Sequence, residues 1–465
     1  MASLEREVID TARYLRSVRP IDPEEIIEYT TGEGSIAEIE SVLRAHAFDL
    51  ELVERNDGTF VPASDEVLSG DTPTIEALPA HLETFIDGQL TWRHGSAWSR
   101  GASGQALRER IRELKARYLE GGSITYDEQD ADAYLLYHFP RSFAATGYVL
   151  GELLEAGLLE RTCRVLDIGA GVGPHLAAVD HFTPDDALIE YVAIEPSPLA
   201  EHLTALGTRC IGRNTHVSIE RQPFDAFNSD GTFDLIVLGN MLSEVEDPEA
   251  LARTSLESLS PDGSWLALAP ADPRTSIQLR EIERSLEPEA TIFSPTIRLW
   301  PSHFPTDECW SFVEHQPIEP PSFQMALSEQ TSDESDTFRN TEIRYSYSIL
   351  RLDGTRRYPL TADESTSLPL ARTADAIGER VDALVVKLSG NLADNGNPIF
   401  RVGDGSQRES CFCSLVSRTS LNEQLAVAPY GSVLRLEQAL VLWNDDEEAI
   451  NLVVDEETFI HQRAP

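Results

Sequence analysis

The chain has 465 residues, which is too long for one hydrophobic core, so we expect three or four domains. It carries 79 acidic and 37 basic residues, a net charge of −42, and its only lysines are Lys115 and Lys387. This composition is typical of proteins adapted to high salt, where a Debye length of about 3 Å at 1 M screens neighbouring carboxylates. An acidic protein from ordinary salt is the alternative. In neither case does the charge exclude nucleic acid as a partner.

The first residues, Met1 to Glu7, hold no apolar signal segment, and no apolar run in the chain reaches the ~20 residues that a membrane-spanning helix needs. We therefore expect a cytoplasmic protein without a membrane partner. The five cysteines include no Cys-x-x-Cys pair, so the sequence predicts neither a disulfide framework nor a zinc ribbon.

Residues 1–65 predict a winged-helix-like domain. Helical periodicity begins at Leu4, a second helix is expected after Asp22-Pro23, and a third follows Ser35 as N-cap. Asn56-Asp57-Gly58, between two short apolar runs, predicts a hairpin. Such domains often bind nucleic acid, but the third predicted helix is not basic, so protein docking or scaffolding is an equally open role.

A linker at residues 63–74 precedes a helical, locally basic segment at 75–160. Within it, the basic residues between Trp92 and Glu120 are Arg93, Arg100, Arg108, Arg110, Arg112, Lys115 and Arg117. Arginine with interleaved aromatic residues suits phosphate contact and base stacking, which makes Arg93–Arg117 a candidate RNA-contacting region. A solvated helix laced by i,i+3 and i,i+4 ion pairs explains the same pattern equally well.

Residues 161–358 predict an α/β domain with a doubly wound sheet. A buried strand ends at Ile168, runs into a glycine-rich turn and continues as a helix from about His175. The next strands are expected at Ile189–Glu195, Val217–Glu220, Thr232–Asn240 and Trp265–Ala269. Alternation of strands and helices predicts a parallel sheet that binds its ligand at the carboxyl ends of the strands.

Two classes of cofactor could bind at that edge of the sheet. The dinucleotide fingerprint Gly-x-Gly-x-x-Gly would need glycine at position 174, where the chain has Pro174. S-adenosylmethionine (SAM) has no phosphate to hold; its site needs a carboxylate near the first turn, an acid for the ribose hydroxyls and a polar group beside the adenine. Asp167, Glu195 and Asp225 follow successive strands in that order, which predicts SAM. The candidate cofactor-binding residues are Asp167, Gly169, Gly171, Gly173, Glu195, Asp225 and Asn240.

Tyr137-His-Phe-Pro-Arg-Ser-Phe-Ala-Ala145, followed by the Val165-Leu-Asp-Ile-Gly-Ala-Gly-Val-Gly173 turn, resembles the methyltransferase-like proteins of the mitochondrial small ribosomal subunit and their prokaryotic relatives. The composition suits a halophilic archaeal relative. The similarity covers residues 105–355, including Phe338–Arg351. The resemblance implies a class I SAM-dependent methyltransferase with a Rossmann-like sheet, associated with small-subunit rRNA or its assembly. It places Asp167, Gly169 and Gly171 in the SAM loop and Glu195 at the ribose.

The chain departs from this family at two places. Several members carry a cysteine cluster after the fifth strand that holds an iron–sulfur centre, whereas Ile292–Trp310 keeps only Cys309, so we expect no iron–sulfur cluster and no metal. Gly239-Asn240-Met241-Leu242 stands in place of the Asn/Asp-Pro-Pro-aromatic loop of base amino methyltransferases, and no catalytic residue is identified. Positioning alone can support methyl transfer, because the sulfonium is already an activated leaving group.

Ser328–Thr337 is an acidic, serine-rich insertion that we expect to be flexible. Strands are expected after it at Arg344–Leu352 and from Tyr358 onward. The arginines of Arg339–Arg357 form a second candidate RNA-facing region, or they line the outside of a half-buried sheet.

Residues 381–465 predict an OB-like β-barrel, with five strands and a short helix after the third. Other small all-β modules have similar strand counts. The candidates for a face that binds single-stranded nucleic acid are Phe400, Arg401, Phe412 and Trp443.

These patterns together predict a cytoplasmic SAM-dependent methyltransferase that acts on small-subunit rRNA during ribosome assembly. A non-catalytic SAM-binding assembly factor is the main alternative. A methyltransferase for a protein or a small molecule is a weaker one.

Overall fold

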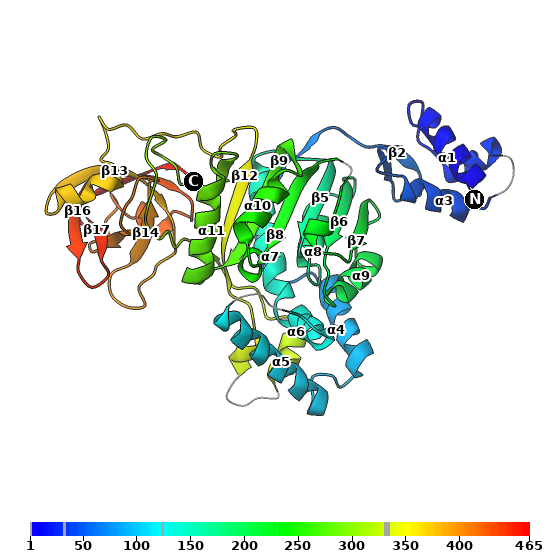
Figure 1. The fold of residues 1–465 in the computed structure, drawn as a ribbon, viewed down its shortest axis with the longest axis horizontal. Coiled ribbons are helices and arrows are strands. Elements are labelled where there is room, and N and C mark those ends of the chain that lie inside the picture. The colour runs from blue at the N-terminus through cyan, green and yellow to red at the C-terminus, as the bar shows by residue number, and fades with distance from the viewer. Residues whose placement is uncertain (1, 31–33, 122–124, 230, 330–334) are drawn as a thin grey trace. The chain divides into compact units, whose positions relative to one another are not determined.

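The structure, a computed structural model, describes residues 2–30, 34–121, 125–229, 231–329 and 335–465 (Figure 1). The described residues fall into two compact units: 1–244 with 257–263 and 317–341, and 245–256 with 264–316 and 342–465. The middle of the predicted flexible insertion, residues 330–334, lies outside the described residues. The predicted division into 1–65, 75–160, 161–358 and 381–465 stays a prediction.

The N-terminal helices and hairpin form the predicted winged-helix-like arrangement. Helices α1 (Ala2–Leu15), α2 (Pro23–Ile26) and α3 (Ile36–Ala45) precede strands β1 (Leu52–Glu54) and β2 (Phe60–Pro62). Ser35 caps α3 in a capping box with Glu38, as its position predicts. Ile21, between α1 and α2, bridges to Phe60 of the hairpin, and both side chains lie in the apolar core that the helices share.

A group of helices leads from this region to the sheet. The short strands β3 (Val67–Leu68) and β4 (Leu159–Glu160) pair with each other, and between them in the chain lie the helices α4 (Ala80–His94), α5 (Gly101–Glu120), α6 (Glu128–Tyr137) and α7 (Phe139–Glu155). Helix α7 is apolar on almost every side and packs against the first helix of the sheet domain.

The central sheet has the strand order β10-β12-β9-β8-β5-β6-β7, and β11 also pairs with β12. Its strands are β5 (Thr162–Ile168), β6 (Leu188–Ile194), β7 (Thr215–Glu220), β8 (Phe233–Gly239), β9 (Leu259–Pro270), β10 (Thr291–Ser294), β11 (Val313–His315) and β12 (Ile343–Arg351). The helices that alternate with them are α8 (Pro174–Phe182), α9 (Ala200–Arg209), α10 (Pro248–Leu256) and α11 (Pro273–Leu286), and α12 (Ser322–Ser328) comes before β12.

The order of these strands distinguishes the two cofactor folds. Strands β5 to β8 are parallel, whereas β12 runs antiparallel to β9 on one side and to β10 on the other. A dinucleotide-binding sheet has its strands all parallel in the order 3-2-1-4-5-6. One reversed strand inserted next to the fifth is the arrangement of class I methyltransferases, so the predicted fold class is confirmed.

Two local predictions were wrong, and two short strands were not predicted. The fifth strand was predicted to begin at Trp265, whereas β9 begins at Leu259. No strand forms at Tyr358, because β12 fills its hydrogen bonds with β9, β10 and β11 instead. Strands β10 and β11 are too short, at four and three residues, to show a period in the sequence.

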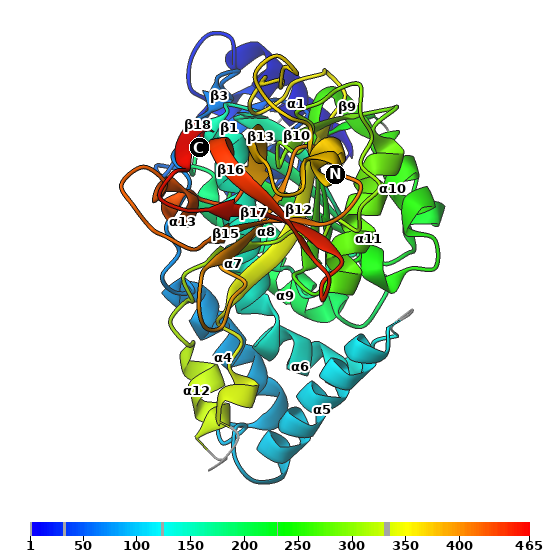
Figure 2. The ribbon, with the colours of Figure 1, turned by 90° about the vertical axis from the view of Figure 1, so that its left-hand side faces the viewer.

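The C-terminal strands close into the predicted OB-like barrel (Figure 2). The elements are β13 (Arg380–Lys387), β14 (Ile399–Gly403), β15 (Cys411–Leu415), α13 (Gln424–Val427), β16 (Val433–Asn444), β17 (Ala449–Val454) and β18 (Phe459–Ala464). The order β13-β14-β15-β17-β16 returns to β13, and β15 runs parallel to β17. Helix α13 follows the third strand, as in OB-folds.

The predicted nucleic-acid face of this barrel was wrong in part. Phe400 is 3% exposed and Arg401 4%, so neither can reach a ligand. The Arg401 guanidinium donates to the Asp307 carboxylate at 3.2 Å and to the Glu308 carbonyl at 2.7 Å. Of the other two candidates, Trp443 is 38% exposed and Phe412 is half-buried.

Candidate functional site

The glycine turn between β5 and α8 lies at the carboxyl edge of the sheet. Gly169, Gly171 and Gly173 all have positive φ, of 74°, 58° and 91°, where a side chain would strain the backbone. A Cβ on Gly169 would meet the Met241 sulfur at 2.5 Å. A Cβ on Gly171 would meet no atom, so the space above Gly171 is open to a ligand.

Glu195 holds this turn in place. One of its carboxylate oxygens accepts from the Gly171 N–H at 2.8 Å and the other from the Ser197 N–H at 2.9 Å. Glu195 follows the carboxyl end of β6 and is 6% exposed. The structure thus brings the first and second predicted acids together at one turn.

Asp167 lies near the end of β5 and is fully buried. One of its oxygens accepts from the Tyr191 hydroxyl at 2.7 Å, and the other has no hydrogen-bond partner among the described residues. Burial raises the pKa of Asp167 to about 7, and nearby Glu195 adds to the effect. A buried carboxylate oxygen without a partner is ready to accept from a ligand.

The remaining two predicted residues lie at the ends of neighbouring strands. Asn240 follows β8 with a φ of 59°, a left-handed conformation that asparagine tolerates. Asp225 lies in a short 3-10 turn after β7 and is exposed. Gly239, at the end of β8, leaves room for the His175 ring, whose Nε2 would be 1.8 Å from a Cβ there.

Sequence reasoning missed a second group of residues at this edge. The Tyr126 hydroxyl donates to the Glu244 carboxylate, 3.0 and 2.9 Å from its two oxygens. The Tyr126 and Tyr134 rings meet edge to face with centroids 5.7 Å apart. Burial raises the pKa of Glu244 to about 7, with Glu195 contributing in the same direction. The position of Glu244 just after the fourth strand was a usable signal; nothing marked Tyr126.

This arrangement fits SAM. Asp167 has a free buried acceptor, Glu195 orders the turn, and the space above Gly171 is open. Asp167, Glu195 and the turn would hold the cofactor's polar groups. SAM supplies the methyl group from its sulfonium. When the methyl group is transferred, the rest of the cofactor leaves as a neutral thioether.

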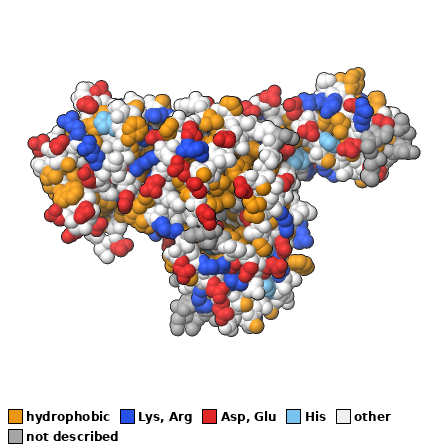
Figure 3. Space-filling model, in the orientation of Figure 1, with side chains coloured by type: hydrophobic (Ala, Val, Ile, Leu, Met, Phe, Trp, Pro, Cys, Tyr) orange, Lys and Arg blue, Asp and Glu red, His pale blue; other side chains and the backbone are white. Residues whose placement is uncertain are grey.

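The predicted basic segment is largely paired within the chain. Arg93 bonds Glu201 at 2.5 Å, Arg110 bonds Asp127 at 2.9 Å, and Arg117 pairs with Asp130. Arg108 is buried. In the space-filling view, Lys and Arg side chains alternate with Asp and Glu over the lower helices (Figure 3). Of the i,i+3 and i,i+4 pairs that the alternative predicts, the structure shows Arg110 with Glu113, whereas the pairs above join this segment to other elements.

The second basic region is also engaged. Arg351 is 2% exposed and bonds Asp353 at 2.6 Å and Ser264 at 2.8 Å. Arg344 is exposed and bonds Glu314 at 2.7 Å. The Arg356 guanidinium donates to the Arg298 carbonyl at 3.3 Å.

Cys309 is fully enclosed, and burial raises the pKa of its thiol. Among the described residues, no group of three or more His, Cys, Asp or Glu is placed to hold a metal ion. The absence of an iron–sulfur cluster stays a prediction. In the same part of the chain, no helix has both the length and the hydropathy needed to cross a membrane.

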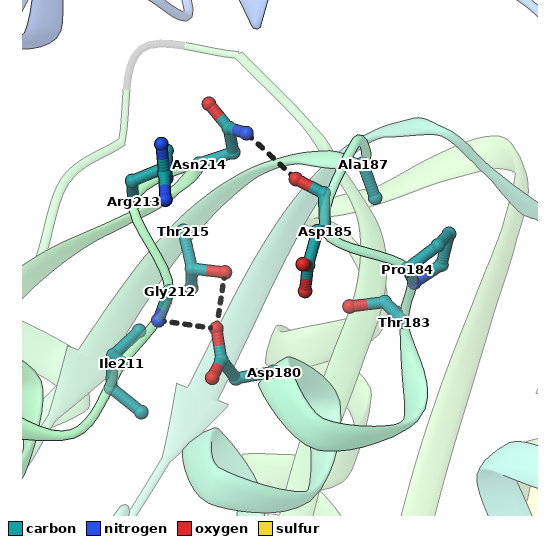
Figure 4. A pocket seen from close by; sticks show the side chains of 10 residues that line it. All are labelled: Asp180, Thr183, Pro184, Asp185, Ala187, Ile211, Gly212, Arg213, Asn214 and Thr215. Carbon is teal, nitrogen blue, oxygen red and sulfur yellow. Dashed lines mark hydrogen bonds between the residues drawn. The ribbon is translucent and has the colours of Figure 1, made fainter. Parts of the chain in front are cut away.

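A hollow of about 400 Å³ lies at the opposite edge of the sheet (Figure 4). It is formed by the loops that lead into β6 and β7. Asp180 joins these loops by accepting from Gly212 N–H at 3.0 Å and from the Thr215 hydroxyl at 2.8 Å. Since parallel strands bind ligands at their carboxyl ends, this hollow is not the cofactor site.

Family models divide the chain in three. Residues 125–315 match the model described as a methyltransferase domain. Residues 5–56 match the N-terminal domain, and residues 371–463 the C-terminal domain, of a family described as a domain of unknown function, DUF8157. No curated protein matches the chain.

Solved methyltransferases are similar to the chain at low identity. One is the N-methyltransferase NodS of Bradyrhizobium japonicum with S-adenosylhomocysteine (SAH). It is 16% identical, the match covers 41% of this chain and 77% of NodS, and the TM-score is 0.26. Another is the plantazolicin methyltransferase BpumL with SAH. It is 12% identical, the match covers 58% of this chain and 96% of BpumL, and the TM-score is 0.30. A candidate RNA methyltransferase from Pyrococcus horikoshii gives 15% identity, 45% and 83% coverage and a TM-score of 0.28.

The sheet order, the turn and the matching domain model define a SAM-dependent methyltransferase of class I fold, with SAM as its cofactor. In this particular chain, the match to the methyltransferase domain lies between the matches to the two DUF8157 domains.

Proposed function

We propose that this methyltransferase acts on small-subunit rRNA during ribosome assembly in the cytoplasm. The observation that carries the proposal is a contact between two stretches on which the ribosomal resemblance rests. The Asn340 side-chain amide donates to the Tyr137 carbonyl at 3.0 Å, although 203 residues separate them in the chain. Tyr137 and Asn340 belong to the same unit of the structure.

A cation of the basic segment joins the same contact. The Lys115 ammonium bonds the Thr337 carbonyl at 2.6 Å and lies 4.3 Å from the centre of the Tyr137 ring. Nearby, the Arg112 guanidinium lies 5.0 Å from the centre of the Phe338 ring. The residues that carry the resemblance therefore pack against α5 and α6. Helix α6 carries Tyr134, and Tyr126 lies just before this helix in the chain.

RNA contacts are proposed for Arg93–Arg117 and Arg339–Arg357. In the first region, Trp92 is 77% exposed and Arg100 is exposed, and together they offer a stacking surface and a charge. Stacking on an aromatic ring loses less in concentrated salt than phosphate contacts do, because those depend on counterion release.

The test is a map of rRNA methylation in a strain that lacks the gene. We expect one small-subunit nucleotide to lose its methyl group, wild-type protein to restore it, and Glu195→Ala not to, because the glycine turn loses its anchor. The matched control is Glu220→Ala, which removes a half-buried acid from β7 at the same sheet edge and should restore methylation.

The second candidate function is a SAM-binding assembly factor without turnover. It is favoured because no motif in the sequence identifies a catalytic residue. Unchanged methylation beside defective small subunits would support it. Unchanged methylation with normal subunits would contradict both ribosomal functions and leave a protein or small-molecule substrate.

A further inference from the structure

Three carboxylates lie at the carboxyl edge of the sheet, where we expect the cofactor. Asp167 and Glu195 lie on or after the first two strands of the domain, and Glu244 lies in a 3-10 turn after β8. Glu195 is close enough to raise the pKa of both other acids. No basic side chain of the described residues contributes to either shift.

Glu244 is fixed in position by Tyr126, close in the chain to a residue that contacts the glycine turn. Met241, three residues before it, covers Gly169 with its side chain. The Tyr126 hydroxyl bonds both oxygens of the Glu244 carboxylate, and Tyr134 lies beside Tyr126 and close enough for Glu244 to raise its pKa. Among the described residues, the titratable groups that interact with Glu244 are therefore Tyr126, Tyr134 and Glu195.

A site of this charge should favour a cation. SAM carries a positive sulfonium, whereas SAH, its product, is a neutral thioether. A carboxylate a few ångströms from a positive charge in a protein environment attracts it strongly enough to change a binding constant by about tenfold or more. Aromatic faces add a smaller attraction for sulfonium-like cations.

We propose that Glu244, held by Tyr126, makes the site select cationic SAM over neutral SAH and so favours release of the product. The proposal rests on SAM as the cofactor and is independent of the ribosomal substrate. It assigns a specificity-determining role to two residues that no sequence motif marks.

The test is calorimetric titration of the full chain in 2 M KCl with SAM, SAH and sinefungin, an analogue with an amine in place of the methylsulfonium. We expect wild type to bind SAM and sinefungin at least about tenfold more tightly than SAH at pH 8. Glu244→Gln should bring the three affinities within about twofold, with that for SAH unchanged. The matched control, Glu246→Gln, removes an exposed acid two residues away and should keep the wild-type preference.

Tyr126→Phe separates charge from structure. Without the hydroxyl, Glu244 loses its hydrogen-bond donor and ionises at higher pH, so the preference for SAM should fall at pH 7 and return by pH 9. Glu244→Gln should show no such recovery.

Two results would overturn the proposal. One is an unchanged preference for SAM in folded Glu244→Gln, and the other is an equal loss of affinity for all three ligands. Failure of wild type to bind any ligand would overturn it together with the cofactor. This binding test does not use the rRNA substrate, so failure of the ribosomal proposal can be distinguished from failure of the Glu244 proposal.

Discussion

Asp167 is the most deeply enclosed acid of the cofactor edge. Its carboxylate keeps one hydrogen bond, to Tyr191, and faces Glu195. The protein therefore maintains a buried group whose charged form is costly until a ligand arrives. Such a group ties ligand binding to protonation, because the cofactor favours the ionised acid.

The pH dependence of stability follows from this burial. The pKa of Asp167 is raised to about 7 in the fold, above the ~3.9 of an unfolded chain, so its stabilising contribution is complete below pH ~4 and is lost as the pH rises towards 7. Asp167→Asn stays neutral. We expect the free energy of unfolding of the cofactor-free variant to gain ~3 kcal/mol relative to wild type between pH 5 and 8, measured by urea denaturation.

The exposed Asp225→Asn variant is the control and should follow wild type at every pH. A difference between Asp167→Asn and wild type that stays constant from pH 5 to 8 would contradict the assignment.

The segment between β10 and β11 is held by the C-terminal barrel through buried polar contacts. Trp300 donates to the Asp404 carboxylate at 2.8 Å, and Arg401 and Arg284 both bond Asp307. These elements belong to one unit. The barrel strand β14, which carries Arg401, therefore uses its side chains to fix this segment rather than to expose a charged face.

Removing the Arg401 guanidinium should be strongly destabilising. Arg401→Met leaves the buried Asp307 with Arg284 as its remaining charged partner, and we expect the free energy of unfolding to fall by about 3 kcal/mol. Arg408→Met, an exposed change in the same barrel, should cost less than about 0.5 kcal/mol. Equal denaturation midpoints for the two variants would show that Arg401 does not fix the segment.

The whole molecule carries a net charge of −42. Buried arginines such as Arg351 and Arg401 are accompanied by buried carboxylates such as Asp307, so burial does not remove the excess of negative charge from the surface. Repulsion between surface carboxylates opposes the compact state unless dissolved ions screen it.

Salt should therefore control the stability of the whole chain. Lowering KCl from 2 M to 0.1 M lengthens the Debye length from about 2–3 Å to about 10 Å, and we expect the unfolding temperature to fall by roughly 10 °C or more. Differential scanning calorimetry measures this shift. Sucrose added at 0.1 M KCl is the control and should restore little, since it does not screen charge. A salt-independent unfolding temperature would contradict adaptation to high salt.

The sequence by itself determined the parts of the site that are local in the chain. The run from β5 through the glycines to α8 is continuous, so Asp167 and the turn could be placed from spacing, and Glu195 followed from the next strand. The capping box of Ser35 and Glu38 and the position of the barrel's helix after its third strand were predictable for the same reason: each depends on neighbours in the chain.

Only the tertiary structure decided which distant residues meet. Tyr126 and Glu244 are 118 residues apart, and no periodic pattern relates a tyrosine before one helix to an acid after a strand. Arg401 alternates along β14 as a surface residue would, but barrel closure and the Asp307 segment bury it. Patterns of two or 3.6 residues report the faces of one element, whereas the partner that covers a face is set by packing across the fold.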